Sequence, residues 1–154
     1  MKIKVKKKAP NFKLNSTSSK TFELSKVKGG LVIYFYPKDA TPGCTKEACN
    51  FRDRWQVFQD HKIKVLGISK DGDNSHKKFI QKHSLPFTLL TDSEPCPVAS
   101  EYQSYGLKKF MGREYMGMMR HTFVIDSNGK IELIYRKVKA EIMANQIISD
   151  LDLE

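Results

Sequence analysis

The chain has 154 residues, of which 40% are hydrophobic and 29% charged, and this composition suits one domain, residues 1–154, with a buried core. No apolar run approaches the ~20 residues of a membrane-spanning helix, and the basic residues 1–8 precede no apolar secretory segment, so we expect a cytoplasmic protein without a membrane partner. The net charge of +10 comes from scattered lysines without a helix-turn-helix, zinc-finger or RNP motif, so we expect a solvated surface and no specific nucleic-acid partner.

The N-terminal part of the chain predicts a β-hairpin that leads into a buried strand. Residues 1–8 alternate lysine with apolar residues, which predicts either a short edge strand or a flexible arm. Residues 9–14 and 21–24 flank a polar turn cluster and predict the hairpin. Residues 31–36 form a continuous apolar run, as expected of a strand buried on both faces of a parallel sheet.

Helices and strands alternate through the middle of the chain. A helix is predicted from Cys44 to about residue 60, where apolar residues recur at spacings of three or four. A buried strand follows over residues 63–68. Asp73 or Asn74 then caps a helix that ends at residue 83, and a short strand spans residues 86–90.

The last third predicts an antiparallel hairpin and a closing helix. A short helix is expected near residues 98–105, followed by the irregular, methionine-rich residues 106–117. Strands 120–125 and 130–135 are joined by an Asn-Gly turn, and a helix spans residues 139–151. Because strand–helix–strand units force parallel pairing, this order predicts a thioredoxin-like three-layer α/β/α sandwich with a mixed central sheet and an N-terminal β-hairpin.

The stretch from Phe35 to Cys49 carries the chemistry. Pro37 stops the buried strand, Thr41-Pro42-Gly43 forms a turn, and Cys44 lies where the next helix begins. The unpaired N–H groups and the partial positive charge of a helix start favour a thiolate over a thiol. The three cysteines form an odd set, which argues against a structural disulfide framework. A helix-start cysteine with a second cysteine five residues later indicates a redox site.

The segment Pro37-Lys-Asp-Ala-Thr-Pro-Gly-Cys44 resembles the Pro-x-x-x-Thr-x-x-Cys motif of peroxiredoxins. It is most similar to the bacterioferritin-comigratory-protein or Q-type subfamily, which often carries a second cysteine where Cys49 stands. Residues 109–117 and 120–130 look like the later segment of that subfamily, including its active-site arginine at Arg120. The resemblance covers nearly the whole chain and implies a thiol peroxidase that uses no cofactor and no metal.

Each residue of the motif has an expected role. Cys44 is the attacking thiolate, and Thr41 places a hydroxyl within reach of sulfur and peroxide. Pro37, together with Pro42, presets the backbone and shields the sulfur from water. Arg120, arriving on a strand, supplies a permanent positive charge, and Glu47, one turn after Cys44, can hold that arginine in place. The resemblance implies the same roles for Thr41, Cys44 and Arg120, and a hydrogen peroxide or organic hydroperoxide substrate.

Attack on a peroxide leaves Cys44 as a sulfenic acid, which condenses with a nearby thiol. Cys49 is the nearest candidate, but five residues of helix advance ~7.5 Å, whereas a disulfide needs Cα atoms within roughly 7 Å. We therefore predict that the first turns of the helix unwind in each cycle. The resemblance implies that thioredoxin then reduces the disulfide, and we expect the protein to be a monomer.

Other interpretations remain open for several residues. Cys44 and Cys49 also fit buried core positions, Glu47 a helix-dipole partner, and Arg120 a surface residue. Cys96 is either a rival resolving thiol or a loop residue without a catalytic part. The methionines of residues 111–119 fill the core, cover the site, line a path for bulky hydroperoxides or form a dimer contact. A redox sensor keeps the cysteine without turnover, whereas a disulfide reductase or a zinc site would need the C-x-x-C pair that is absent.

Overall fold

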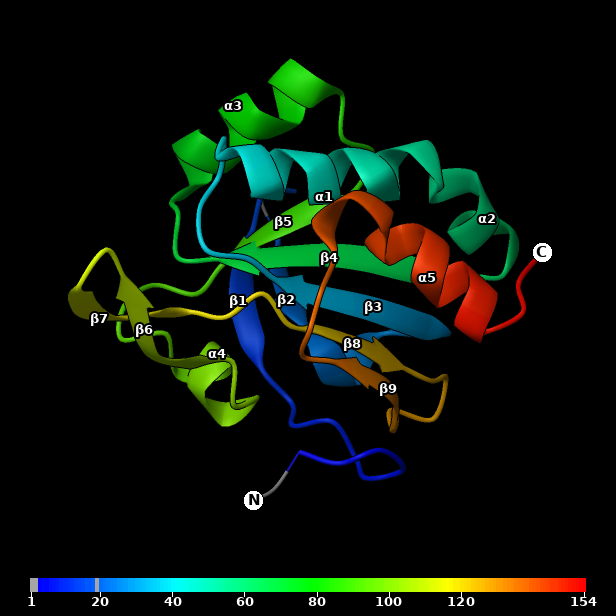
Figure 1. Ribbon diagram of the computed structural model, residues 1–154. Helices are drawn as coiled ribbons and strands as arrows, with labels where there is room; N and C mark the ends of the chain where they lie inside the picture. Colours follow the sequence, from blue (N-terminus) through cyan, green and yellow to red (C-terminus); the bar gives the residue numbers. More distant parts are fainter. Residues whose placement is uncertain (1–2, 19) are drawn as a thin grey trace.

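The computed structural model describes residues 3–18 and 20–154 and contains one large mixed sheet with helices on its faces (Figure 1). The strand order of this seven-stranded sheet is β2-β1-β5-β4-β3-β8-β9. Its strands are β1 (Lys13–Ser16), β2 (Thr21–Glu23), β3 (Gly30–Phe35), β4 (Ile63–Ser69), β5 (Thr88–Thr91), β8 (Thr122–Ile125) and β9 (Ile131–Tyr135). Pairing is parallel between β3, β4 and β5 and antiparallel at both edges, so the predicted mixed sheet is confirmed.

The helices lie in unequal layers on the two faces. Figure 1 shows α1 (Pro42–Asp53), α2 (Trp55–Asp60), α3 (Asp73–His83) and α5 (Met143–Asp150) on one side of the sheet, and α4 (Pro97–Glu101) on the other side. The 3₁₀ turn η1 (Leu24–Lys26) and the N-terminal segment complete the second side, whereas the 3₁₀ turn η2 (Ala140–Ile142) leads into α5. The predicted three layers are therefore present, with the thinner layer built partly from irregular chain.

The central strand β3 explains this arrangement. Val32 and Tyr34 point into the core beneath α1, and Leu31 and Ile33 point into the core of the opposite face. All of these side chains are at most 1% exposed. The continuous apolar run is thus buried on both sides, as the sequence predicted. The Tyr34 ring also stacks on Phe51 with centroids 4.8 Å apart, which fixes the second half of α1 to the sheet.

Several predicted boundaries were wrong. The helix predicted over residues 44–60 begins at Pro42 and is divided at Arg54 into α1 and α2. Gly72, rather than Asp73 or Asn74, is the N-cap of α3. The helix predicted near residues 98–105 ends at Glu101, and the helix predicted from residue 139 starts as a 3₁₀ turn. No helix of the described residues combines the length and apolarity needed to cross a membrane.

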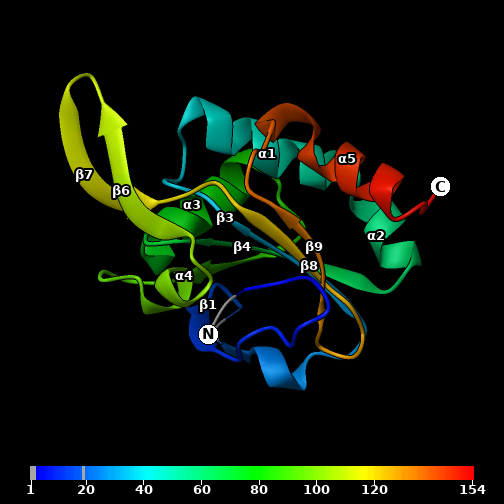
Figure 2. The same ribbon diagram turned by 60° about the horizontal axis from the view of Figure 1, so that its bottom comes forward.

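Residues 106–117 were predicted to be irregular, and this was wrong. They belong to a two-stranded hairpin of β6 (Tyr105–Phe110) and β7 (Arg113–Met118), which projects from the body of the molecule in both views (Figures 1 and 2). The methionines divide accordingly: Met118 is buried at the base of the hairpin, whereas Met111 and Met116 are exposed.

The N-terminal arm is neither the edge strand nor the flexible arm that were the two predictions for it. Residues 1–2 are outside the described part of the chain. Lys6 donates its backbone N–H to Ile131 O at 2.7 Å, and Ile131 N donates to Lys7 O at 2.9 Å. Lys8 forms a single antiparallel bridge with Lys130. Residues 3–8 are therefore attached near β9 without forming a regular strand.

Candidate active site

Cys44 lies at the carboxyl end of β3, in the first turn of α1. Thr41 is the N-cap of this helix with an extended backbone, and Pro42 follows at the first helical position. Cys44 is therefore the third residue of the helix, and it is 1% exposed. The sequence predicted Cys44 near the helix start, but Pro42 and Gly43, which were predicted as part of a turn, already belong to the first turn of the helix.

Thr41 does not cap the helix with its side chain. Its hydroxyl donates to Lys38 O at 2.9 Å, within the loop that leads from β3. Because the proton is engaged there, the Thr41 oxygen retains its lone pairs for a donor that enters the site. Pro37 is half-buried at the start of the same loop, directly after the strand. Both residues thus lie in the loop that precedes Cys44, as the motif predicted.

Arg120 reaches Cys44 from the other side of the site. Its Nη2 lies 3.3 Å from Cys44 Sγ, and its Nη1 donates to Glu47 Oε1 at 2.9 Å. Nη2 would also lie 3.1 Å from a Cβ at Gly43, so the guanidinium packs closely against the helix start. Arg120 was predicted to lie on a strand, and this was wrong, because β8 begins two residues later.

Burial affects the charges of the two partners in the Arg120–Glu47 pair differently. Glu47 is fully buried, and its Oε2 has no hydrogen-bond partner among the described residues. Burial raises the pKa of Glu47 to about 7, although Arg120 acts to lower it. Burial acts to lower the pKa of Arg120, but Cys44 and Glu47 outweigh it and the pKa is raised. Arg120 therefore remains a cation, whereas Glu47 titrates near neutral pH.

Sequence reasoning missed a buried network that holds the loop before Cys44. Asp39 accepts hydrogen bonds from Tyr36 Oη at 2.6 Å and Ser75 Oγ at 2.8 Å, and its Oδ2 lies 2.7 Å from His76 Nδ1. The other His76 nitrogen lies 3.0 Å from Leu90 O. A carbonyl and a carboxylate can only accept, so both ring nitrogens of His76 face acceptors.

This network fixes the loop to α3 and β5. Burial alone would raise the pKa of Asp39, but the hydrogen bonds from His76 and Tyr36 outweigh it and lower the pKa. The Asp39 N–H also donates to Asp71 Oδ2 at 2.7 Å. Asp39 and His76 are 37 residues apart, and no local pattern links them. Their pairing therefore becomes visible only in the folded chain.

The other two cysteines have different positions. Cys49 is half-buried in α1, in the same unbroken helix as Cys44, and both are free thiols. Cys96 is fully buried at the N-cap of α4, in the core on the opposite face of the sheet. Burial, with Asp92 and Glu94 nearby, raises the pKa of Cys96 to about 11. Because the sheet separates Cys96 from Cys44, Cys49 is the better placed partner.

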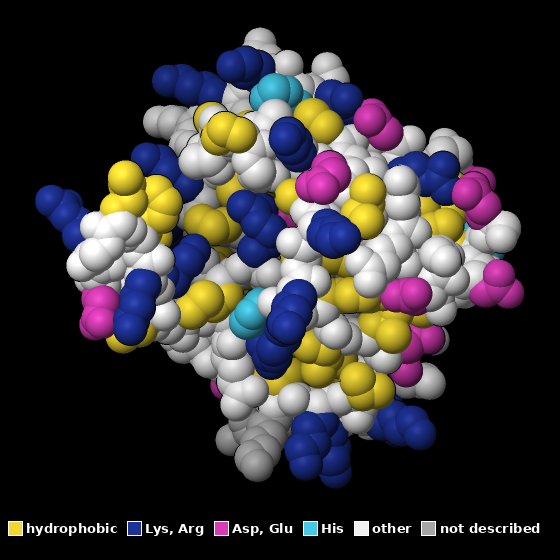
Figure 3. Space-filling model, viewed as in Figure 1, with side chains coloured by type: hydrophobic (Ala, Val, Ile, Leu, Met, Phe, Trp, Pro, Cys, Tyr) yellow, Lys and Arg dark blue, Asp and Glu magenta, His cyan; other side chains and the backbone are white. Residues whose placement is uncertain are grey.

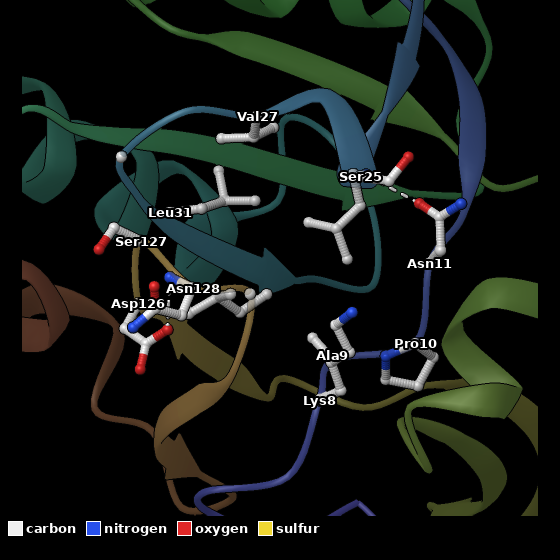
Figure 4. Close-up of a pocket in the computed structure, with 14 residues that line it drawn as sticks. Lys8, Ala9, Pro10, Asn11, Ser25, Val27, Leu31, Asp126, Ser127 and Asn128 are labelled. Carbon is white, nitrogen blue, oxygen red and sulfur yellow. Dashed lines mark hydrogen bonds between the residues drawn. The ribbon is translucent and has the colours of Figure 1, made fainter.

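A cavity of about 460 Å³ lies at the other end of β3, away from Cys44 (Figure 4). Its polar side chains are used locally: Asn11 Oδ1 accepts from Ser25 N at 2.8 Å, and Asp126 Oδ1 accepts from the N–H groups of Asn128 and Lys130. None of the described residues that line it is a cysteine. The reactive groups of the described chain therefore gather at the opposite end of the sheet.

The comparisons with known proteins agree with this geometry. A model described as the AhpC/TSA family matches residues 5–134. The chain belongs to the AhpC/TSA family. It is 45% identical over 142 residues to Peroxiredoxin Bcp of Bacillus subtilis (strain 168), covering 92% of this chain and 90% of that protein. The chain is therefore a thiol peroxidase of the subfamily that the sequence resembled.

Solved structures support the same fold. The bacterioferritin comigratory protein of Xanthomonas campestris, described for its alkyl peroxide reduction activity, has a TM-score of 0.84 and 31% identity, covering 92% of this chain and 90% of that one. A cysteine-to-serine mutant of Xylella fastidiosa PrxQ has a TM-score of 0.90 and 27% identity, covering 99% of this chain and 97% of that one. The predicted thioredoxin-like fold is confirmed.

Proposed function

We propose that Cys44 is the peroxidatic residue and that the chain reduces hydrogen peroxide and organic hydroperoxides. The observation that carries this proposal is the 3.3 Å contact between Arg120 Nη2 and Cys44 Sγ at the start of α1. The thiolate attacks one peroxide oxygen, the O–O bond breaks, and the leaving oxygen takes up a proton to become water or an alcohol. Arg120 stabilises the negative charge before and during this step, and Glu47 holds the guanidinium in position.

Cys49 then resolves the sulfenic acid: its thiol forms the S–S bond to Cys44 and water leaves. Five helical residues separate the two cysteines by ~7.5 Å along the axis, so the start of α1 must unwind for the bond to form. The two halves of α1 differ in a way that permits this local unwinding. No side chain of the described residues caps its first turn. In its second half, Asn50 Oδ1 accepts from Ala144 N at 2.6 Å. The unwinding therefore stops before Asn50.

Thioredoxin, or a similar dithiol protein, reduces the disulfide and returns Cys44 to the thiol. Members of this family act with thioredoxin-type reductants, which supports this assignment. The cycle suits a reducing compartment such as the cytoplasm, because the disulfide must be reduced in every turnover. We infer that the protein acts as a monomer, because Cys44, Cys49 and Arg120 all come from one chain.

The test is steady-state NADPH consumption with thioredoxin and thioredoxin reductase, joined to mass spectrometry of the peroxide-treated protein. We expect continuous turnover and a Cys44–Cys49 disulfide. Cys44→Ser abolishes turnover, whereas Cys49→Ser oxidises once and then stops. A single oxidation event in the unaltered protein would indicate a sensor and contradict the proposal. Full turnover by Cys49→Ser would contradict its resolving role.

A further inference from the structure

Lys108 lies on a particular face of the β6–β7 hairpin. In the antiparallel register, Gly106 pairs with Gly117, and Lys108 pairs with Tyr115. Paired residues point to the same side of a hairpin, and successive residues alternate. Lys108 therefore shares its face with the two glycines, whereas the next residue, Lys109, lies on the opposite face.

The glycines allow the Lys108 side chain to lie flat on the hairpin. A Cβ at Gly117 would lie 2.9 Å from Lys108 Cδ, so a larger residue there would displace the lysine stem. The Lys108 ammonium donates to Met118 O at 3.0 Å, and its side chain is half-buried. Met119 Cε would lie 3.4 Å from a Cβ at Gly106 on the same face. This face of the hairpin is therefore turned toward the segment that ends in Arg120.

Lys108 is a cation without an acidic partner in salt-bridge contact, within residues 3–18 and 20–154. Figure 3 shows Lys and Arg side chains in the hollow between the projecting hairpin and the body. The ionisable groups that act on the Lys108 ammonium are Arg120, which precedes β8, and Cys44 of α1. Burial and Arg120 lower the pKa of Lys108, while Cys44 acts to raise it. Of the two cations, only Arg120 is paired with a carboxylate of the described chain.

We propose that Lys108 is a second electrostatic residue of the site, whose unpaired ammonium acts through space on the Cys44 sulfur and favours its thiolate. The glycine-faced hairpin and the hydrogen bond to Met118 O hold that charge at a carbonyl two residues before Arg120 in the chain. Lys108 is thus a positioning charge and does not contact the reacting atoms. The inference deepens the proposed function and rests on Cys44 being the attacking sulfur.

The test compares Lys108→Met, which keeps most of the stem and removes the charge, with Lys109→Met. Lys109 lies next to it, is exposed, and pairs with Glu114 at 3.6 Å on the other face, so it is a matched control. Stopped-flow rates of Cys44 oxidation by hydrogen peroxide are measured from pH 5 to 9. We expect Lys108→Met to react about three- to tenfold more slowly at pH 7, with its pH profile moved upward, and Lys109→Met to match the unaltered protein.

Two further variants separate charge from packing. Lys108→Arg keeps the charge and should recover most of the rate. Gly117→Ala displaces the lysine stem without removing the charge and should give an intermediate loss. Screening by 1 M salt should narrow the difference between Lys108→Met and the unaltered protein.

Equal rates and pH profiles for Lys108→Met and Lys109→Met would overturn the proposal. So would a loss in Lys108→Met that Lys108→Arg fails to recover and that leaves the pH profile unmoved, because that pattern indicates packing. Turnover retained by Cys44→Ser would instead contradict the proposed function itself, so the two failures are distinguishable.

Discussion

Cys44 and Cys96 are equally buried, at 1% and 0% exposure, and both lie at the start of a helix. Their surroundings differ in charge. Cys44 has the guanidinium of Arg120 at 3.3 Å, whereas burial and two nearby carboxylates raise the pKa of Cys96 to about 11. Burial at a helix start is therefore not sufficient to make a cysteine reactive. We infer that the reactivity of Cys44 comes from the positive charge of Arg120 beside its sulfur.

The largest expected difference comes from removing each sulfur. Cys44→Ser should lower peroxidase turnover at least about a thousandfold, because the nucleophile is lost. Cys96→Ser should leave turnover within about twofold, since Cys96 lies across the sheet and contributes only packing. The measurement is thioredoxin-coupled NADPH consumption for both variants. A large loss in Cys96→Ser with normal stability would break the comparison.

Removing the positive charge of Arg120 should have the second largest effect. Arg120→Met should slow Cys44 oxidation about a hundredfold, because one preorganised donor to the developing charge is lost. Arg136→Met serves as a control, because its guanidinium lies over the Phe123 ring, 5.5 Å from the centroid. Stopped-flow oxidation by hydrogen peroxide compares the two, and similar rates would contradict the role of Arg120.

The loop that precedes Cys44 should depend on the buried carboxylate of Asp39. Asp39→Asn weakens the acceptor of the hydrogen bonds from Tyr36, Ser75 and His76, so we expect a loss of about 3 kcal/mol in the free energy of unfolding. Because the lowered pKa of Asp39 stabilises the fold above its ordinary titration range, the unaltered protein should lose this contribution as pH falls through acid values. The difference between the two proteins should therefore be full at pH 7 and shrink on acidification.

Urea unfolding at several pH values measures that difference, with Cys44 oxidation followed alongside. A rate about tenfold lower in Asp39→Asn would reflect misplacement of the loop before Cys44. Asp73→Asn is the control, because Asp73 pairs with Lys77 on the exposed face of the same helix that carries His76. Equal stability of the two variants at pH 7 would contradict the loop-holding role of Asp39.

Replacing Glu47 should change the stability in the opposite direction. Its raised pKa means that the folded state binds a proton more tightly than the unfolded state between pH ~4.5 and ~7. Stability is therefore lost as pH rises through this range. Glu47→Gln removes the buried charge but keeps an acceptor for Arg120, so it should be more stable than the unaltered protein at pH 8, by up to about 3 kcal/mol, and nearly equal at pH 4.5. Thermal unfolding at the two pH values decides it.

Much of the fold and of the site was predictable, because local signals determined them. The apolar runs of β3 and β4 predicted the buried parallel core, and Thr-Pro-Gly located the start of α1 to within two residues. The β6–β7 hairpin was missed for a physical reason. Its turn residues Met111 and Gly112 both have positive φ, 50° and 78°, and this turn usually shows itself as Asn-Gly.

Contacts between distant residues account for the rest. The Asp39–His76 pair joins a loop to a helix 37 residues later, and the bond from Lys108 to Met118 O forms only because residues 105–118 fold into a hairpin. Glu47 was proposed from its spacing, and the sequence gives no sign that one of its oxygens is buried without a partner among the described residues. Electrostatic environments of this kind depend on tertiary packing, which periodicity does not describe.

The most direct test of the central claim is the pH dependence of alkylation at Cys44 and Cys96 within one sample, read peptide by peptide by mass spectrometry after brief iodoacetamide exposure. The two sulfurs are equally buried, so differences in access are small and the comparison reports charge. We predict that Cys44 is alkylated at a lower pH than Cys96, because Arg120 lies 3.3 Å from its sulfur, whereas burial raises the pKa of Cys96 to about 11. Parallel pH profiles for the two cysteines would contradict the account.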